Sequence, residues 1–289
     1  MPVFALLALL LAPKGNLLGL PEAPSRYATL RGMKVHYVAY GEGKAALVFV
    51  HGWCCDMSFW AQQVGAFGKV PVVLVDLPGH GLSDKPEVGY GADLFAEAID
   101  AVLQAQGVSK AVLVGHSMGT PAIREFYRKH PEKTLALVAV DGSLRAVGSP
   151  EFMKARAARL QVENYQEALG AAVDSMLGPP ASPELKAAVR GVMLRAPRHV
   201  ATSAMEMMGD PRIWTPDPIR VPLLVILARS PFWSGDYEAF VRALAPQVEY
   251  HVLDGVDHFL MIERPDEFNG LLSSFLARNG LLLLKPATP

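Results

Sequence analysis

The sequence predicts an α/β fold in which a mostly parallel, doubly wound sheet carries an inserted helical cap. Short apolar runs alternate with amphipathic helical patterns along most of the 289 residues, as expected for strands that are buried on both faces. This alternation stops between residues 143 and 218, where helical patterns follow one another without a strand. The length suits one large domain with an insertion, and 51% hydrophobic residues can fill its core.

The elements of the predicted sheet follow one another in a simple order. A β-hairpin comes first, because Arg31-Gly32 separates two strand-like runs. We expect strands at 27–30, 34–40, 46–50, 71–75, 111–114, 135–140, 222–227 and 248–253, and helices at 58–67, 91–106, 120–128, 237–244 and 265–277. The cap is expected to hold a helix from 151 onward and further helices at 165–177, 183–195 and 199–208.

Residues 1–25 stand apart from this pattern as a leader and linker. Val3 to Ala12 is apolar, which matches the core of a signal peptide and is too short to span a bilayer. This predicts export to the periplasm or the medium; a short hydrophobic anchor or a disordered start, with a cytoplasmic protein, are the alternatives. The rest divides into a core of residues 26–142 and 219–289 and a cap of residues 143–218.

Composition and missing motifs exclude several classes of protein. A net charge of −1 gives no basis for binding nucleic acid. The phosphate-binding, dinucleotide-binding and zinc-protease patterns are missing, so we expect neither a cofactor nor a metal. Cys54 and Cys55 are adjacent and are expected to be free, buried side chains. No stable membrane span is expected, and nothing in the sequence indicates an oligomeric state.

Gly115-His116-Ser117-Met118-Gly119 is the most informative segment. It follows a buried strand and opens a helix, so Ser117 stands on a sharp turn with glycines on either side. A serine in that context is typical of an enzyme nucleophile. The hydroxyl needs a base within hydrogen-bond reach, because a free serine reacts poorly.

This order of elements resembles the α/β-hydrolase superfamily over residues 26 to 279. The segments that carry the resemblance are His51-Gly52-Trp53 after a strand, Asp76 to Asp84 after the next strand, the Ser117 turn, and Asp257-His258-Phe259 after the last strand. The resemblance implies that His258 is the base. It also implies that the backbone N–H groups of Trp53 and Met118 form the oxyanion hole.

The acid departs from the commonest pattern of the superfamily. Its usual place, the loop after the strand at 222–227, holds no carboxylate, and Pro231 stands there. Asp141, at the end of the preceding strand, is the expected acid. Asp236 is the alternative, although an aspartate directly before a helix also reads as an N-cap. A third alternative is that no functional acid exists.

These residues predict a serine hydrolase that cleaves a small to medium apolar carboxylic ester through an acyl-enzyme. The cap methionines at 193, 205, 207 and 208 fit core packing, and any that face Ser117 would make an apolar pocket. Carbon–carbon bond hydrolysis or perhydrolysis on the same fold is an alternative. A receptor-like protein that binds a ligand and turns it over weakly is another, from a different class.

Overall fold

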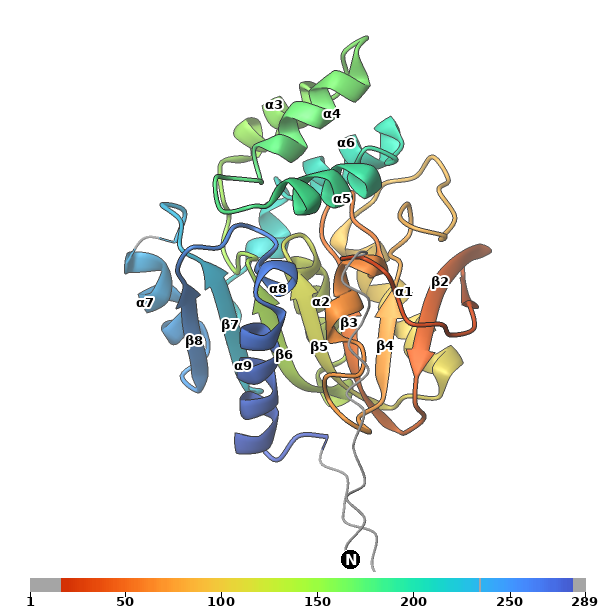
Figure 1. The fold of residues 1–289 in the computed structure, drawn as a ribbon, viewed down its shortest axis with the longest axis vertical. Coiled ribbons are helices and arrows are strands. Elements are labelled where there is room, and N and C mark those ends of the chain that lie inside the picture. Colours follow the sequence, from red (N-terminus) through yellow and green to blue (C-terminus); the bar gives the residue numbers. More distant parts are fainter. Residues whose placement is uncertain (1–16, 234, 283–289) are drawn as a thin grey trace, which may run out of the picture.

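An eight-stranded sheet forms the centre of the molecule (Figure 1). The computed structural model describes residues 17–233 and 235–282. The strand order is β1-β2-β4-β3-β5-β6-β7-β8; β2 is antiparallel to β1 and to β4, and all other neighbours are parallel. The strands are β1 Arg26–Leu30, β2 Met33–Tyr40, β3 Ala45–Val50, β4 Val72–Val75, β5 Lys110–His116, β6 Thr134–Val140, β7 Leu223–Ala228 and β8 Val248–Leu253.

Solid apolar runs place the central strands in the interior. Val48, Leu113, Leu137 and Leu223 pair in one row across β3, β5, β6 and β7, and all four are buried. Apolar side chains on both faces of a strand require cover on both sides, which the helices provide. Since these strands are parallel, their carboxyl ends meet at one edge of the sheet, where loops can bring distant residues together.

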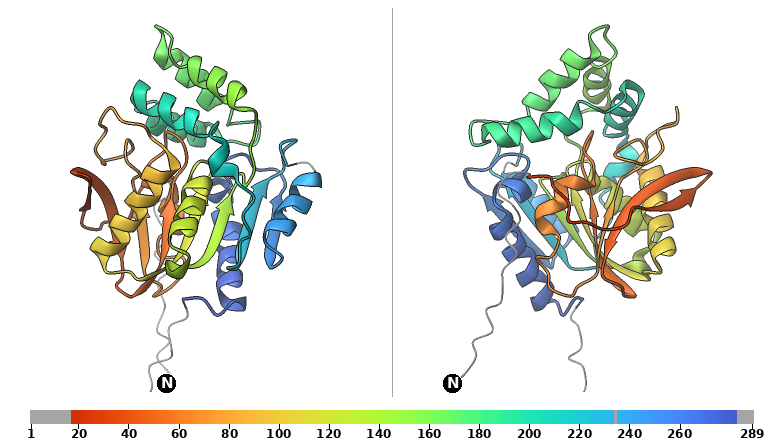
Figure 2. Two further views of the ribbon diagram at one scale, coloured as in Figure 1. Left: turned by 180° about the vertical axis from the view of Figure 1, so that it is seen from behind. Right: turned by 45° about the vertical axis from the view of Figure 1, so that its right-hand side comes forward.

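The helices cover the two faces of the sheet. Helices α1 and α2 pack against each other on one face, and α9 and the 3₁₀-helix η1 lie on the opposite face (Figure 2). Among the described residues, no helix is long and apolar enough to cross a membrane. The covering elements are α1 Ala92–Gln106, α2 Gly119–Lys129, α7 Gly235–Leu244, α8 Leu260–Glu263, α9 Pro265–Arg278, η1 Met57–Gln63 and η2 Pro131–Lys133.

Four helices between β6 and β7 form the inserted cap, beyond the carboxyl ends of the strands (Figure 1). They are α3 Pro150–Ala158, α4 Tyr165–Asp174, α5 Pro183–Met193 and α6 Arg198–Met207, followed by the 3₁₀-helix η3 Pro211–Trp214. Met193, Met205 and Met207 are buried in the packed interior. The class of fold and its helical cap are confirmed, and the domain boundaries stay a prediction.

The helix expected at 58–67 is a shorter 3₁₀-helix, η1. The Asp56 side chain caps its start by accepting a hydrogen bond from the Ser58 N–H at 2.9 Å. Val64 is extended, and Gly65 and Gly68 have positive φ, so the helix ends at Gln63. The periodic apolar residues misled the prediction because they also fit a 3₁₀ turn that packs on the sheet.

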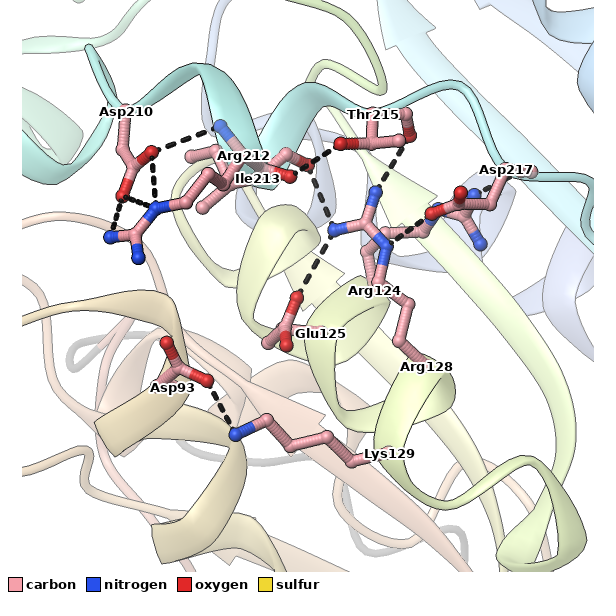
Figure 3. Close-up of polar contacts among 10 residues, drawn as sticks. All are labelled: Asp93, Arg124, Glu125, Arg128, Lys129, Asp210, Arg212, Ile213, Thr215 and Asp217. Atoms are coloured by element: carbon pink, nitrogen blue, oxygen red, sulfur yellow. Dashed lines mark hydrogen bonds and ion pairs between the residues drawn. The ribbon is translucent and has the colours of Figure 1, made fainter.

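The segment that returns from the cap to the sheet is tied to α2 by Arg128 (Figure 3). Its guanidinium donates to the carbonyl oxygens of Ile213 and Thr215 at 3.0 and 2.7 Å and to the Asp217 carboxylate at 2.8 Å. Arg124, one turn earlier, donates to the Asp217 carbonyl oxygen. The exit of the cap is therefore fixed to the helix that starts at the Ser117 turn.

The predicted leader lies largely outside the described residues, which begin at Leu17. Within the described part of the predicted linker, Leu17 and Leu18 pack against the core. The Leu17 carbonyl accepts a hydrogen bond from Gln62 Nε2 at 3.0 Å, and the Pro21 carbonyl accepts one from the Tyr40 hydroxyl at 2.8 Å. Residues 17–21 thus lie on the body of the protein.

Candidate active site

Ser117 occupies a sharp turn between β5 and α2. Its φ is +52°, a conformation that L side chains seldom adopt, and its N–H donates to the Val140 carbonyl at 2.9 Å. A Cβ on Gly115 would lie 2.5 Å from the Gly119 carbonyl oxygen, and one on Gly119 would lie 2.6 Å from the Val50 carbonyl oxygen. The two glycines are needed because the backbone passes this close to itself.

Asp141 lies at the end of β6, with its side chain buried. Its φ is +40°, and its N–H donates to the Ile226 carbonyl at 2.8 Å. Carboxylate oxygen Oδ1 accepts hydrogen bonds from the Ala228 N–H at 2.9 Å and from the Trp233 indole N–H at 3.1 Å. The other oxygen, Oδ2, lies 2.6 Å from the His258 ring.

His258 follows β8 in a loop at the same edge of the sheet. Its Nδ1 donates to Asp141 Oδ2, an arrangement that leaves Nε2 with a free lone pair. Its carbonyl oxygen accepts a hydrogen bond from His116 Nε2 at 2.8 Å, and the two imidazole rings lie 4.6 Å apart. Burial and the nearby His258 hold the pKa of His116 well below its usual value. His116 therefore stays neutral beside His258.

Asp236, the alternative acid, lies elsewhere. It begins α7 and its carboxylate pairs with Arg145, at 2.9 Å to Nη1 and 3.2 Å to Nη2. Its side chain is 69% exposed, whereas that of Asp141 is 8% exposed. Of the two candidate acids, the structure brings Asp141 to His258.

Trp53 and Met118 supply backbone amides close to the serine turn. Met118 follows Ser117, and Trp53 follows Gly52, where an added Cβ would lie 3.1 Å from the Ser117 Cβ. Within residues 17–233 and 235–282, neither amide has a hydrogen-bond acceptor. The Trp53 indole donates to the Ala201 carbonyl of α6 at 2.8 Å, which ties this loop to the cap. Both amides are thus available to a ligand atom.

Comparison with known proteins places the chain in a family. The model of the alpha/beta hydrolase family matches residues 47–271. The chain belongs to this family. A 2-hydroxy-6-oxononadienedioate/2-hydroxy-6-oxononatrienedioate hydrolase of Paraburkholderia phymatum is 29% identical over 265 residues, which cover 85% of this chain and 92% of that protein.

Two solved structures of alpha/beta hydrolases are similar to this chain. The enol-lactonase of Burkholderia xenovorans is 27% identical with a TM-score of 0.78, over 87% of this chain and 100% of that one. An N-acyl homoserine lactone degrading enzyme is 26% identical with a TM-score of 0.73, over 86% of this chain and 100% of that one. The chain is a hydrolase, as its relatives are.

Other buried histidines of this alpha/beta hydrolase shape the loops around the site. His51 Nδ1 donates to the Gly52 carbonyl at 2.8 Å, and its Nε2 accepts from the Leu77 N–H at 3.0 Å. Burial lowers the pKa of His51 and lowers that of His80 to about 3. Both rings are neutral at pH 7 and hold the loops after β3 and β4 in place.

Sequence reasoning missed two contacts, one with His258 and one with Asp141. His116 supports the His258 backbone, and the Trp233 indole supports Asp141. A histidine inside the serine turn was visible in the sequence, but its direction was not. Trp233 stands two residues after Pro231, at the place where a carboxylate was sought, so a polar N–H there was the available signal.

The described residues give no sign of a metal site. Among them, no group of three or more histidine, cysteine, aspartate or glutamate side chains is arranged to hold an ion. Cys54 and Cys55 are free and buried, and burial raises the pKa of each thiol well above its usual value. The chemistry that the arrangement can support is that of a hydroxyl, an imidazole, a carboxylate and two amides.

Proposed function

We propose that this hydrolase uses Ser117 as nucleophile, His258 as general base and Asp141 as acid to cleave a small to medium apolar carboxylic ester. The observation that carries the proposal is the 2.6 Å contact between His258 Nδ1 and the buried Asp141 carboxylate, at the edge of the sheet where Ser117 sits on its strained turn. A buried carboxylate fixes the tautomer of an imidazole and stabilises its protonated form.

The proposed reaction has two steps. Ser117 Oγ attacks the ester carbonyl carbon while its proton moves to His258 Nε2, and the carbonyl oxygen becomes an oxyanion held by the amides of Trp53 and Met118. The protonated His258 then gives that proton to the departing alcohol, which leaves an acyl-enzyme. Water, deprotonated by His258, attacks the acyl carbon and releases the carboxylic acid and the free serine.

The oxyanion-hole amides and the Asp141 carboxylate each lower the activation free energy of the proposed reaction. Loss of one oxyanion donor costs about 3 kcal/mol, and loss of the acid behind the imidazole costs about four powers of ten in rate in enzymes of this type. The free lone pair of His258 Nε2 supports the role of base, because the Nδ1 proton is already committed to Asp141. The Trp53 and Met118 amides, which have no acceptor among the described residues, support the oxyanion hole.

The related structures support an ester-like bond as the target. One is an enol-lactonase and another degrades N-acyl homoserine lactones, and a lactone is a cyclic ester. Both are more than a quarter identical to this chain and cover 86% and 87% of it. A linear or cyclic ester of low polarity is the substrate class that we infer.

Hydrolysis of a carbon–carbon bond is a second candidate. The relatives at 29% and 28% identity are hydrolases of 2-hydroxy-6-oxononadienedioate, and they match 85% of this chain. Such a reaction uses the same kind of fold, and its leaving group is carbon, which takes up a proton, rather than an alcohol. The named compounds are dioates, so a substrate of this class carries two carboxylates, whereas an apolar ester carries none.

The test compares the purified wild type with Ser117→Ala on three substrate sets. These are p-nitrophenyl esters with acyl chains of two to ten carbons, γ- and δ-lactones, and a 2-hydroxy-6-oxo-dienedioate whose absorbance falls on cleavage. We expect ester or lactone turnover that disappears in Ser117→Ala, with intact thermal unfolding in the variant. Turnover of the dioate alone would establish the second candidate, and turnover that survives in Ser117→Ala would refute both.

A further inference from the structure

The loop between β7 and α7 reaches Asp141 through an indole rather than a carboxylate. Trp233 Nε1 lies 3.1 Å from Asp141 Oδ1, the oxygen that does not contact His258. We infer that Trp233 is a positioning residue: its N–H holds the Asp141 carboxylate in the orientation that serves His258. The inference rests on the proposed function, because it concerns the acid of that site.

The Asp141 carboxylate accepts hydrogen bonds from three donors. The Ala228 N–H and the Trp233 indole both donate to Oδ1, at 2.9 and 3.1 Å, and His258 Nδ1 donates to Oδ2 at 2.6 Å. Without the indole, each carboxylate oxygen would keep one donor, the Ala228 N–H on Oδ1 and His258 Nδ1 on Oδ2, and the group could twist further about its bond to Cβ. A second donor on the same oxygen, from a different segment, fixes the plane of the group and so the direction in which Oδ2 points.

The indole itself is held firmly. A tight turn precedes it, in which the Trp233 N–H donates to the Ser230 carbonyl at 3.0 Å and the Phe232 N–H donates to Ser230 Oγ at 3.2 Å. Its ring lies 4.9 Å, centroid to centroid, from the ring of Tyr237, which is fully buried in α7. A ring that is packed against a buried ring and follows a hydrogen-bonded turn can orient a hydrogen-bond partner with less loss of side-chain entropy.

The same aromatic pair also supports the backbone that follows the acid. The Tyr237 hydroxyl accepts a hydrogen bond from the Leu144 N–H at 3.0 Å and lies 3.4 Å from the Gly142 carbonyl oxygen, to which it donates. A Cβ on Gly142 would lie 2.0 Å from Thr120 Oγ1, so the chain is closely confined there. Trp233 and Tyr237 thus hold the side chain of Asp141 and the turn behind it.

Removal of the indole N–H should change the chemistry and leave substrate binding alone. Without it, less of the negative charge on Asp141 is shared with Trp233, and more of it stabilises a proton on His258. The protonated, inactive base then persists to higher pH, which moves the acid limb of kcat/KM upward. A looser carboxylate also lowers kcat, by about tenfold for a hydrogen bond to a charged group.

The first experiment compares Trp233→Phe with Trp214→Phe on an ester that the wild type hydrolyses. Phenylalanine keeps an aromatic ring beside Tyr237 and removes the N–H; in the control, the lost N–H donates to the Met208 carbonyl in the cap at 2.9 Å. We expect Trp233→Phe to lower kcat about tenfold, keep KM within about twofold and raise the acid-limb midpoint, and Trp214→Phe to change none of these. An unchanged pH profile in Trp233→Phe, or equal losses in both variants, would overturn the inference.

The second experiment needs no turnover. In ¹⁵N-labelled Ser117→Ala protein, the four tryptophans give four indole N–H signals, assigned with the two phenylalanine variants. Adding Asp141→Asn removes the acceptor's charge, so the Trp233 signal should move to higher field while the Trp214 signal stays. A Trp233 signal that does not move would refute the inference. If no ester or lactone turnover depends on Ser117, the proposed function fails whatever this spectrum shows.

Discussion

Replacement of Asp141 by asparagine should cost far more activity than the same change at Asp236. The structure dictates how the introduced asparagine must sit. Oδ1 of the native side chain accepts two N–H donors, from Ala228 and Trp233, so the amide oxygen of asparagine has to occupy that position. The amide NH₂ then faces His258 Nδ1, donor against donor.

The His258 ring can relieve this clash only if its proton moves from Nδ1 to Nε2. With an NH₂ opposite, Nδ1 must become the acceptor and Nε2 must carry the hydrogen, which removes the lone pair that the proposed base needs. A wrong tautomer of this kind lowers kcat by about 10⁴, or about 5 kcal/mol of barrier. Asp236 is 69% exposed and pairs with Arg145 at the surface, so Asp236→Asn should change kcat by less than about twofold.

The assay is kcat and KM for a p-nitrophenyl ester between pH 5 and 9, with circular dichroism to verify that both variants are folded. We expect kcat to fall by three to four powers of ten in Asp141→Asn while KM changes little. Similar losses in the two variants, or a larger loss in Asp236→Asn, would refute the assignment of the acid and the tautomer argument with it.

Three further outcomes follow from other contacts. Trp53→Phe removes the indole bond to the Ala201 carbonyl, so the protein should lose about 1 kcal/mol of stability in urea unfolding and KM should rise as the cap loosens. Because burial lowers the pKa of His80 to about 3, the unfolded chain binds a proton that the folded one rejects as pH falls from about 6.5; the free energy of unfolding should drop over this range, and less steeply in His80→Phe. Cys54 and Cys55 should resist iodoacetamide at pH 8 in the folded protein and react in urea, and fast labelling in buffer would contradict their burial.

The strands were predictable because a buried strand requires a continuous run of apolar residues, which is visible in the local sequence. A continuous apolar run such as Leu223 to Ala228 admits few interpretations when turns bound it, and the strand forms there. The Ser117 turn was equally visible, since glycines at 115 and 119 are required by close backbone contacts around it. Where local geometry requires a particular residue type, as it requires glycine here, the structure can be predicted from the sequence.

The sequence favoured Asp141 over Asp236 but left the alternative open, because the partner of either aspartate is remote in the chain. Asp141 and His258 are 117 residues apart, and the local signals, a strand end for Asp141 and a helix start for Asp236, do not say which side chain meets the histidine. Only the alignment of the strand ends in the folded sheet brings Asp141 to His258. The Trp233 contact was hidden for the same reason, as the direction of a loop side chain depends on packing against α7.

The attachment of the cap exit to α2 has a practical consequence. Arg128 fixes the returning chain at residues 213–217, so changes in the helices upstream of that anchor need not displace α2, the helix that begins at the Ser117 turn. Libraries that randomise side chains within 150–207 while retaining 211–217 would keep this anchor, provided that the backbone also keeps the Ala201 carbonyl near the Trp53 indole and the Ala181 N–H near Asp257. An engineered cap therefore needs three attachment points to the core: Arg128, the Trp53 indole and the Asp257 carboxylate.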